Sequence, residues 1–274
     1  MLFQPTAEVI ADSLNCITGD RLTTMVVKFH RFILPEFNTH RMFSKNASSS
    51  RAIPVNRLIN NVIADNVYPL HWGKNQKGMQ AERELDEHEI ADAVFAWQTA
   101  RDTAIHTARY LTDLGVHKQV VNRLLEPFST VTMIVSATEW DNFFKQRKHK
   151  DAQPEIQALA FKMSAVYESS SPDVLKPGDW HIPFVNPLVD ICGSLMPKLK
   201  IAAGRAARVS YLTHKGIRDI SEDMRLHDDL LVADPKHLSP FEHQAITLPE
   251  STRVGNFTGF KQYRRFIELG EDVC

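Results

Sequence analysis

Cysteine is scarce in this sequence, which also lacks long apolar runs. The three cysteines, Cys16, Cys192 and Cys274, are far apart and odd in number. This usage argues against a disulfide framework and favours a reducing compartment. No apolar run approaches the ~18 residues of a membrane-spanning helix, and the N-terminal residues lack the basic and apolar regions of a signal peptide. We therefore expect a cytoplasmic protein without a membrane partner.

Neither sign of charge is in excess. The formal net charge is −1, so the chain has no global field that would attract nucleic acid or an anionic membrane. The 274 residues are 43% hydrophobic and 24% charged, an ordinary globular composition that can form one large domain or two small ones. Any binding of anions must therefore come from local groups.

Signatures of many common sites are missing as well. There is no HExxH and no cysteine pair at ligand spacing, so no metal site is predicted. The glycine-rich nucleotide motifs are absent, and so is the G-x-S-x-G elbow of serine hydrolases. The remaining chemistry lies in segments rich in arginine, serine and histidine.

Hydrophobic periodicity predicts an α+β fold in which helices dominate. β-branched and aromatic runs indicate strands, while three- and four-residue spacing indicates helices. Gly115 is expected to end a helix. Expected strands cover residues 23–35, 131–137 and 244–248; expected helices cover 55–67, most of 81–128, two parts of 138–168, 198–216, 220–232 and a short C-terminal segment; expected loops cover 68–80 and 169–187.

One segment, Thr39–Pro54, concentrates histidine, arginine, asparagine and serine between an apolar run and a proline. Hydroxyl and guanidinium groups at the end of a strand favour an anion site, because arginine offers a planar fork of donors and serine adds short hydrogen bonds. The alternative is a solvated polar loop. Composition alone leaves these two interpretations nearly even.

Further segments of the same character could converge on one anionic ligand. Taken singly, each has a simpler explanation. Arginines on helices are mostly exposed charges, and Ser239-Pro240 can start a helix. The segments are NRLLEP with Arg123, DNFFKQR with Arg147, AARVS with Arg208 and Ser210, and HLSPFEH, His237–His243.

Together these segments resemble the flavin-dependent thymidylate synthases of the thymidylate synthase complementing protein type. That family carries R-H-R, seven residues and then S, continued as S-x-N-E-x-S-x-R-Y. It also carries A-R-x-x-x-P, N-x-x-x-x-R followed by A-Q-x-E-I, A-R-x-S, and H-x-[ST]-P-F-E-H. The similar residues here are Thr39-His40-Arg41 with Ser44, Asn46, Ser49 and Arg51; Arg123 and Pro127; Asn142, Arg147 and Ala152–Ile156; Ala207–Ser210; and His237–His243.

The chain departs from the family pattern in three respects. The last two blocks follow the R-H-R block, whereas they usually precede it. A permuted member explains this order, and a partial duplication represented by Lys261–Arg265 is the alternative. Thr39 replaces the leading arginine, and Ala47 and Ala52 replace the family glutamate and tyrosine.

The resemblance implies a single domain over residues 1–274, helix-rich α+β with an antiparallel or mixed sheet. It implies a homotetramer with FAD bound in active sites at subunit interfaces. The implied reaction converts dUMP to dTMP, with methylenetetrahydrofolate as one-carbon donor and NADPH as reductant. A mechanism of this kind needs no cysteine nucleophile.

The resemblance also implies residue roles. Arg147 is the expected catalytic residue, because a fixed guanidinium stabilises negative charge that develops on the pyrimidine. The expected dUMP-binding residues are Ser49, Arg51, Arg123 and Arg147. The expected FAD-binding residues are His40, Arg41, Asn46, Asn142, Ser210, His237, Ser239 and Glu242.

Two alternatives remain open. A related enzyme could transfer a hydroxymethyl group or act on another pyrimidine nucleotide, as the block order and Ala47 suggest. A non-enzymatic module could instead bind nucleic acid through the basic run Lys145–Lys150. The near-zero net charge and the few aromatic residues near that run count against nucleic acid as a partner.

Overall fold

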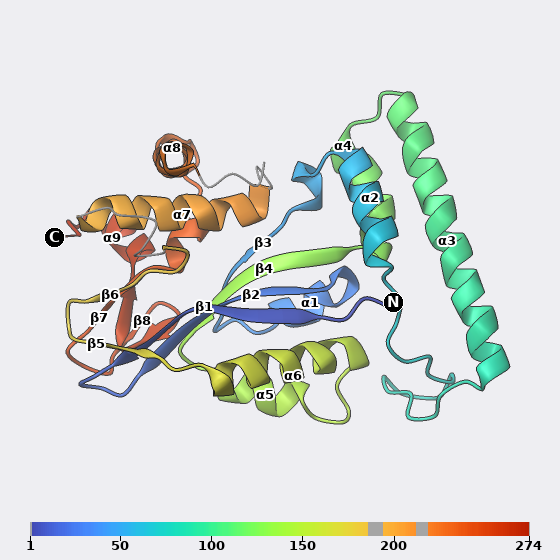
Figure 1. The fold of residues 1–274 in the computed structure, drawn as a ribbon, viewed down its shortest axis with the longest axis horizontal. Helices are drawn as coiled ribbons and strands as arrows, with labels where there is room; N and C mark the ends of the chain where they lie inside the picture. The colour runs from blue at the N-terminus through green and yellow to red at the C-terminus, as the bar shows by residue number, and fades with distance from the viewer. Residues whose placement is uncertain (1, 186–193, 212–218, 274) are drawn as a thin grey trace.

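A five-stranded sheet lies at the centre of the protein (Figure 1). The computed structural model describes residues 2–185, 194–211 and 219–273, without the side chains of residues 210 and 211. The strand order is β3-β4-β2-β1-β5, antiparallel except that β5 runs parallel to β1. The strands are β1 (Thr6–Asn15), β2 (Arg21–His30), β3 (Ser44–Ala47), β4 (Thr130–Ala137) and β5 (Asp173–Leu175).

Two smaller sheets are built mostly from the C-terminal part of the chain. One has the order β10-β7-β6 and the other pairs β8 with β9. Both have antiparallel pairs. Their strands are β6 (Trp180–His181), β7 (Ala245–Thr247), β8 (Arg253–Val254), β9 (Phe257–Thr258) and β10 (Phe260–Gln262).

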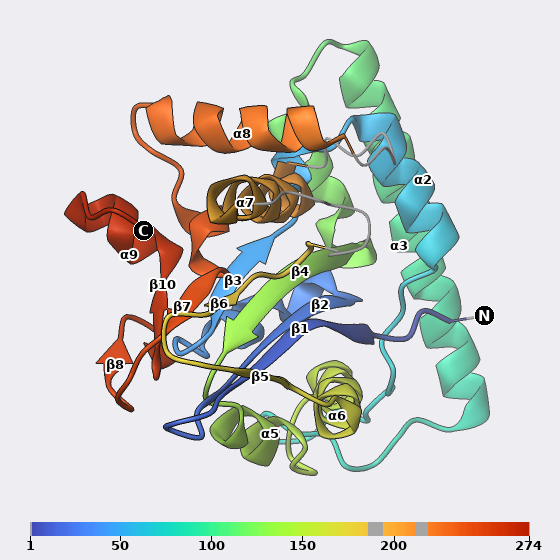
Figure 2. The same cartoon turned by 60° about the vertical axis from the view of Figure 1, so that its left-hand side comes forward.

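Helices cover both faces of the central sheet. In Figures 1 and 2, α5 and α6 lie on one face, α7 lies on the other with α8 on its outer side, and α2 and α3 stand at one end. The α-helices are α1 (Leu34–Asn38), α2 (Val55–Asp65), α3 (Glu87–Asp113), α4 (Lys118–Val121), α5 (Asp141–Arg147), α6 (Pro154–Ser169), α7 (Leu195–Tyr211), α8 (Ile220–Val232) and α9 (Tyr263–Leu269); the 3-10 helices are η1 (Arg31–Ile33), η2 (Ser50–Ala52), η3 (Asn122–Phe128) and η4 (Ser239–Glu242). The predicted α+β class is confirmed. Over the described ranges, no helix has the length and apolarity needed to cross a membrane.

The alternation of side chains along β2 and β4 explains how both faces are filled. On one face Val27, Met133 and neighbouring strand residues pack against Phe143 of α5 and Leu159 of α6, all buried. On the other face Ile134 packs against α7. Successive residues of a strand point to opposite faces, so a single pair of strands supports both helical layers.

Several element boundaries differ from the sequence-based expectation. The strand expected to reach Pro35 ends at His30, because Pro35 lies in the first turn of α1, where its missing N–H costs nothing. Strand β1 was not predicted, and β3 lies inside the polar cluster. The expected loop 169–187 contains β5 and β6, and its last two residues lie outside the described ranges, as do residues 212–216 of the expected helix 198–216.

The long helix α3 begins later than the periodicity indicated. Asp86 and Glu89 form a reciprocal capping box, which satisfies backbone donors that a helix start leaves free. The expected end near Gly115 is confirmed, since Gly115 has a φ of 81° just beyond the helix. This left-handed conformation suits glycine.

Helices α7 and α8 touch closely through Gly204 and Asp223. A Cβ atom at Gly204 would lie 2.1 Å from the backbone oxygen of Asp223. The Asp223 carboxylate is buried. It accepts a hydrogen bond from Arg205 Nε at 3.0 Å, and its other oxygen lies 2.7 Å from Arg208 Nε. The close backbone approach and this buried ion pair therefore hold the two helices together.

Gly204→Ala should destabilise the protein by about 1–3 kcal/mol, because the added methyl must push α8 away in a packed interior. Helix propensity alone predicts the opposite sign, a gain of about 1 kcal/mol for replacing glycine by alanine. Urea unfolding followed by circular dichroism measures the difference. A variant more stable than the parent protein would contradict the close contact.

Candidate active site

Strand β3 presents polar groups on both of its sides. Ser44 and Asn46 are buried and face α7 and η4. Asn46 Nδ2 donates to the Ala206 backbone oxygen of α7 at 2.7 Å, and Ser239 Oγ of η4 donates to Asn46 Oδ1 at 3.3 Å. The structure thus joins the polar cluster to the ARVS and HLSPFEH segments, which lie far away in sequence.

The HLSPFEH segment is also held by residues near the C-terminus. Gln262 Nε2 donates to Ser44 Oγ and to the Glu242 backbone oxygen, both at 2.8 Å. The Glu242 carboxylate pairs with Arg264. Residues of the segment Lys261–Arg265 therefore support η4 against β3.

A chain of buried hydrogen bonds docks the end of the same segment on the sheet. It runs from Ser13 to His181 Nδ1 (2.8 Å), from His181 Nε2 to Thr24 (2.8 Å), from Thr24 to Ser136 (2.7 Å) and from Ser136 to His243 Nδ1 (2.8 Å). Burial lowers the pKa of both His181 and His243 to about 3. Both imidazoles are therefore neutral at neutral pH.

On the other side of β3, Arg147 is held by His40 and Thr39. Arg147 Nε donates to His40 Nε2 at 2.8 Å, and Nη2 donates to Thr39 Oγ1 at 3.2 Å. Burial, followed by the positive charges of Arg147 and Lys45, lowers the pKa of His40 to about 4. A neutral imidazole can accept the hydrogen bond from Arg147. Because Nε and Nη2 of Arg147 are both held, the plane of the guanidinium is fixed.

The ring of His40 is fixed in turn by aromatic packing. It makes a T-shaped contact with Phe143, with centroids 4.9 Å apart, and stacks on Phe43 at 5.8 Å. Lys45 Nζ donates to the backbone oxygen of His40 at 3.0 Å. The guanidinium of Arg147 therefore rests on a group that is itself well packed.

A third group of polar residues surrounds Glu126 at the other end of β3. Its carboxylate accepts from Ser50 Oγ at 2.5 Å and from Arg123 at 2.9 Å, and lies 3.3 Å from Arg31 Nε. Burial opposes ionisation, but the Ser50 hydrogen bond and the charges of Arg31 and Arg123 hold the pKa of Glu126 below its usual value. Arg51 is exposed on the short helix η2, next to Ser50, and Ser49 is half-buried just before this helix. We call Arg31, Arg51 and Arg123 the cationic cluster.

The predicted site residues thus fall into three groups. His40 and Arg147 are in contact, as are Asn46 and Ser239, with Glu242 nearby in η4. Arg123 pairs with Glu126, while Ser49 and Arg51 are the chain neighbours of Ser50, which donates to the same carboxylate. Arg41, Asn142 and His237 are exposed. Ser210 lies in α7, and its side chain is outside the described residues.

Sequence reasoning missed three residues of these groups. They are Lys45 beside His40, Arg31 beside Glu126, and Gln262 beside Ser44. Lys45 lies between the motif positions Ser44 and Asn46, so the motif could have indicated that Lys45 is near the site. Gln262 lies in the segment Lys261–Arg265, which the sequence indicated only as a possible duplication. Arg31 reaches the site through the fold alone and carried no signal.

Comparison with known proteins identifies the family of the chain. The model of the family described as thymidylate synthase complementing protein matches residues 21–173. The chain belongs to this family. The matched range contains the His40, Ser49, Arg123 and Arg147 segments, whereas the ARVS and HLSPFEH segments lie beyond it.

A solved structure has a fold similar to that of this chain. A UMP/dUMP methylase PolB from Streptomyces cacaoi, bound with 5-Br UMP, is 14% identical, with a TM-score of 0.50 over 60% of this chain and 89% of that chain. The same methylase bound with 5-Br dUMP is 13% identical, with a TM-score of 0.48 over 61% and 91%. Among curated proteins, none matches the chain.

Stability should fall as the pH drops from about 7 to about 5, because unfolding lets the buried histidines take up protons. His40, His181 and His243 have folded pKa values well below the ordinary 6.5. The unfolded chain therefore binds more protons throughout this window, and the free energy of unfolding increases with pH. The shifted carboxylates Asp12 and Glu126 are ionised in both states above about pH 5.5 and add little there.

Urea unfolding at a series of pH values measures this slope. His106→Gln is the matched control, because His106 is exposed on α3. The control should keep the slope of the parent protein. A stability that is flat between these pH values would show that the buried imidazoles are protonated in the folded protein.

Proposed function

We propose that the protein is a flavin-dependent methylase of a pyrimidine nucleotide, converting dUMP to dTMP. Methylenetetrahydrofolate would donate the one-carbon unit and NADPH the electrons, in a homotetramer of single-domain chains. Family membership supports a methyltransferase of nucleotide biosynthesis. The contact between Arg147 and neutral His40 is the observation that supports the catalytic role most directly.

Arg147 would act on the pyrimidine. For C5 of uracil to attack a one-carbon unit, negative charge must develop on the ring carbonyl oxygens. A guanidinium whose plane is already fixed by His40 and Thr39 stabilises that charge without reorganising during the reaction. A protonated His40 could not accept from Arg147, so its low pKa keeps the guanidinium in place at neutral pH.

The cationic cluster would hold the nucleotide phosphate. Arg51 and Arg123 are exposed and can offer bidentate hydrogen bonds to phosphate oxygens. Glu126 orders Arg31 and Arg123 and partly neutralises them. Ser49 is half-buried two residues before Arg51. Its hydroxyl, on a shorter side chain, would donate a further hydrogen bond to the phosphate.

The donor set fits FAD, whose pyrophosphate accepts hydrogen bonds from cations and amides. The exposed residues Arg41, Asn142 and His237 would make such contacts directly. His40, Asn46, Ser239 and Glu242 already have partners within the chain, so they would shape the site around the flavin. FAD, when bound, would supply the redox chemistry of the one-carbon transfer.

The decisive experiment combines binding and product analysis. Protein mixed with FAD and then desalted should keep the flavin, and its visible absorption bands should shift when dUMP is added. With methylenetetrahydrofolate and NADPH, mass spectrometry should find dTMP. Loss of all flavin on desalting, or turnover that needs no flavin, would overturn the proposal.

Arg147→Ala should lower kcat by about 10²–10³ or more, since it removes a donor fixed for the developing charge. FAD should remain bound, because Arg147 is assigned to the pyrimidine. Steady-state kinetics and the flavin spectrum measure the two effects. Lys145→Ala is the control, an exposed cation on the same helix, and should have nearly normal activity. Near-normal turnover of Arg147→Ala would show that Arg147 does not stabilise the charge on the pyrimidine.

Arg51→Ala should raise KM for dUMP about tenfold with kcat little changed, the loss expected for one charge-assisted hydrogen bond. Arg57→Ala is the control, since Arg57 is exposed on the neighbouring α2. The two variants are compared in initial-rate assays at several salt concentrations. Equal KM values for both variants would exclude Arg51 from the phosphate site.

A second candidate activity is transfer of a hydroxymethyl group, or reaction with another pyrimidine nucleotide. It is favoured by Ala47, where the family has glutamate, because Ala47 packs against the apolar core beneath the sheet and offers no polar group. The product mass separates methyl from hydroxymethyl. Competition between UMP and dUMP in one reaction identifies the preferred nucleotide.

A further inference from the structure

Glu126 lies beside the cationic cluster, although a carboxylate repels the phosphate that this cluster would hold. Its side chain is 24% exposed, next to Arg31 at 11% and Arg123 at 55%. Burial opposes its ionisation, but the hydrogen bond from Ser50 and the charge of Arg31 hold its pKa below the usual value. The carboxylate is therefore ionised at neutral pH, and a fixed negative charge lies within 3.3 Å of two arginines.

Three donors converge on one oxygen of this carboxylate. Ser50 Oγ at 2.5 Å, Arg123 Nη1 at 2.9 Å and Arg31 Nε at 3.3 Å all meet Oε1. Arg31 Nη1 also donates to the Ser48 backbone oxygen at 3.3 Å. Among the described residues, the other oxygen of Glu126, Oε2, has no partner. Glu126 thus occupies donors that could meet a ligand, and it presents a second oxygen that carries negative charge.

The short helices that carry these groups are docked on one another. Asn122 of η3 is fully buried, and its Nδ2 donates to the backbone oxygens of Ser50 at 2.7 Å and Ile53 at 2.9 Å. Lys118 Nζ of α4 donates to the Ala52 backbone oxygen at 3.0 Å. Helices η2 and η3 are therefore held in a fixed relation, and so are the arginines and the carboxylate that they carry.

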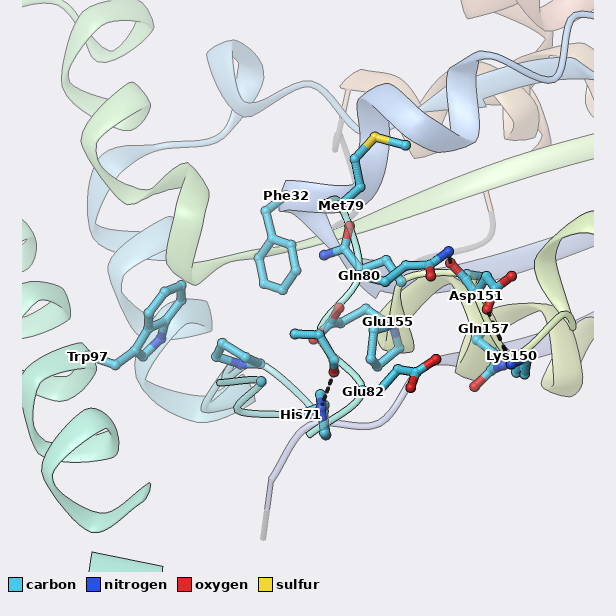
Figure 3. Close-up of a pocket in the computed structure, with 16 residues that line it drawn as sticks. Phe32, His71, Met79, Gln80, Glu82, Trp97, Lys150, Asp151, Glu155 and Gln157 are labelled. Atoms are coloured by element: carbon cyan, nitrogen blue, oxygen red, sulfur yellow. Dashed lines mark hydrogen bonds and ion pairs between the residues drawn. The ribbon is translucent and has the colours of Figure 1, made fainter. Parts of the chain in front are cut away.

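The turn that carries Arg31 is anchored by aromatic packing. The neighbouring Phe32 makes a T-shaped contact with Trp97 of α3, with ring centroids 6.4 Å apart, and Trp97 Nε1 donates to the Val67 backbone oxygen at 3.0 Å. Both rings line one pocket, whose volume is about 930 Å³ (Figure 3). Arg31 is therefore fixed beside Glu126 and does not extend to a ligand in solvent.

The donors that remain suffice for a single phosphate group. Arg51 is exposed and has no partner in the part of the chain that the structure describes, and Arg123 keeps its donors other than Nη1. Two guanidinium groups can each form a pair of hydrogen bonds to one phosphate. A second phosphoryl group would find no third guanidinium free in the cluster, and the charge of Glu126 would repel it.

We propose that Glu126 is a specificity-determining residue, which restricts the cationic cluster to a single phosphate group and excludes diphosphates and triphosphates. The carboxylate acts in two ways: it engages Arg31 and Arg123, and it adds a like charge where a further phosphoryl group would lie. This inference rests on the proposed function in one respect, the placement of a nucleotide phosphate at the cationic cluster.

The first measurement uses the unaltered protein with FAD added, so it does not depend on any variant folding. Isothermal titration calorimetry compares dUMP with dUDP and dUTP, and inorganic phosphate with pyrophosphate. In a cationic site without Glu126, the more negative ligand would bind more tightly. We expect the opposite order, with dUMP bound about tenfold more tightly than dUDP or dUTP. Equal or tighter binding of dUDP would overturn the proposal.

Glu126→Gln removes the charge and keeps an oxygen that can accept from Ser50. The preference for dUMP over dUDP should fall about tenfold, chiefly because dUDP binds more tightly, and pyrophosphate should gain on phosphate in the same way. Glu268→Gln is the matched control, because Glu268 of α9 is 26% exposed and also pairs with two arginines, Arg264 and Arg265. This control should keep the preference of the parent protein.

The outcomes distinguish this proposal from the methylase proposal. A preference for dUMP that is lost in Glu126→Gln, without any formation of dTMP, would support the role of Glu126 and count against the methylase. Formation of dTMP, with the same preference in Glu126→Gln as in the parent protein, would overturn the role of Glu126 alone. Weakening of all ligands by one factor would also overturn it, since Glu126 would then only hold the arginines in place. No binding of any of these phosphates at millimolar concentration would overturn both.

Discussion

The antiparallel pairing of β3 with β4 is the contact on which the candidate site depends. Its register places Ser44 opposite Ser136 and Asn46 opposite Ile134. With that register, Asn46 reaches α7 and η4, while Lys45 reaches His40 on the opposite side. A shift of one residue would turn every side chain of the strand to the other face. The register of four residues thus decides which polar group meets His40 and which groups meet α7 and the C-terminal segments.

Much of the fold could be predicted because helical periodicity is local. The segments that became α2, α6 and α8 carried it clearly. Strand β3 could not be predicted, because its Ser-Lys-Asn-Ala sequence resembles a loop and becomes a strand only through pairing with β4, more than 80 residues later along the chain. Strand β1 has a weak alternation and is stabilised by β2 and α6.

The site was predictable to the extent that motif residues carried it. His40 and Arg147 were both expected, and the structure brings them together. Arg31 lies outside the motif blocks, and Gln262 lies in a segment that offered only a faint resemblance. Tertiary packing brings them to Glu126 and Ser44. Spacing in a sequence can indicate which side chains share a site, but the residues that support them depend on the packing of distant elements.

The departures from the family pattern have visible structural settings. An arginine at position 39 would place a second cation beside Arg147. The Thr39 hydroxyl instead accepts a hydrogen bond from Arg147 and donates to the Glu36 backbone oxygen. Thr39 therefore orients the guanidinium where another cation would repel it. Ala47 faces the core side of β3, where its methyl group packs with apolar neighbours.

The short helix η1 carries Arg31 and Phe32 in adjacent positions. Arg31, a member of the cationic cluster, lies 3.3 Å from Glu126, while Phe32 lines a pocket together with Trp97 and residues of the segment 69–82. A displacement of this single turn would thus alter the cationic cluster and the pocket together. Thermodynamic linkage makes any such effect reciprocal: a ligand that moves η1 in one site changes affinity at the other by the same factor as the reverse. Two ligands that never touch could in this way set each other's occupancy.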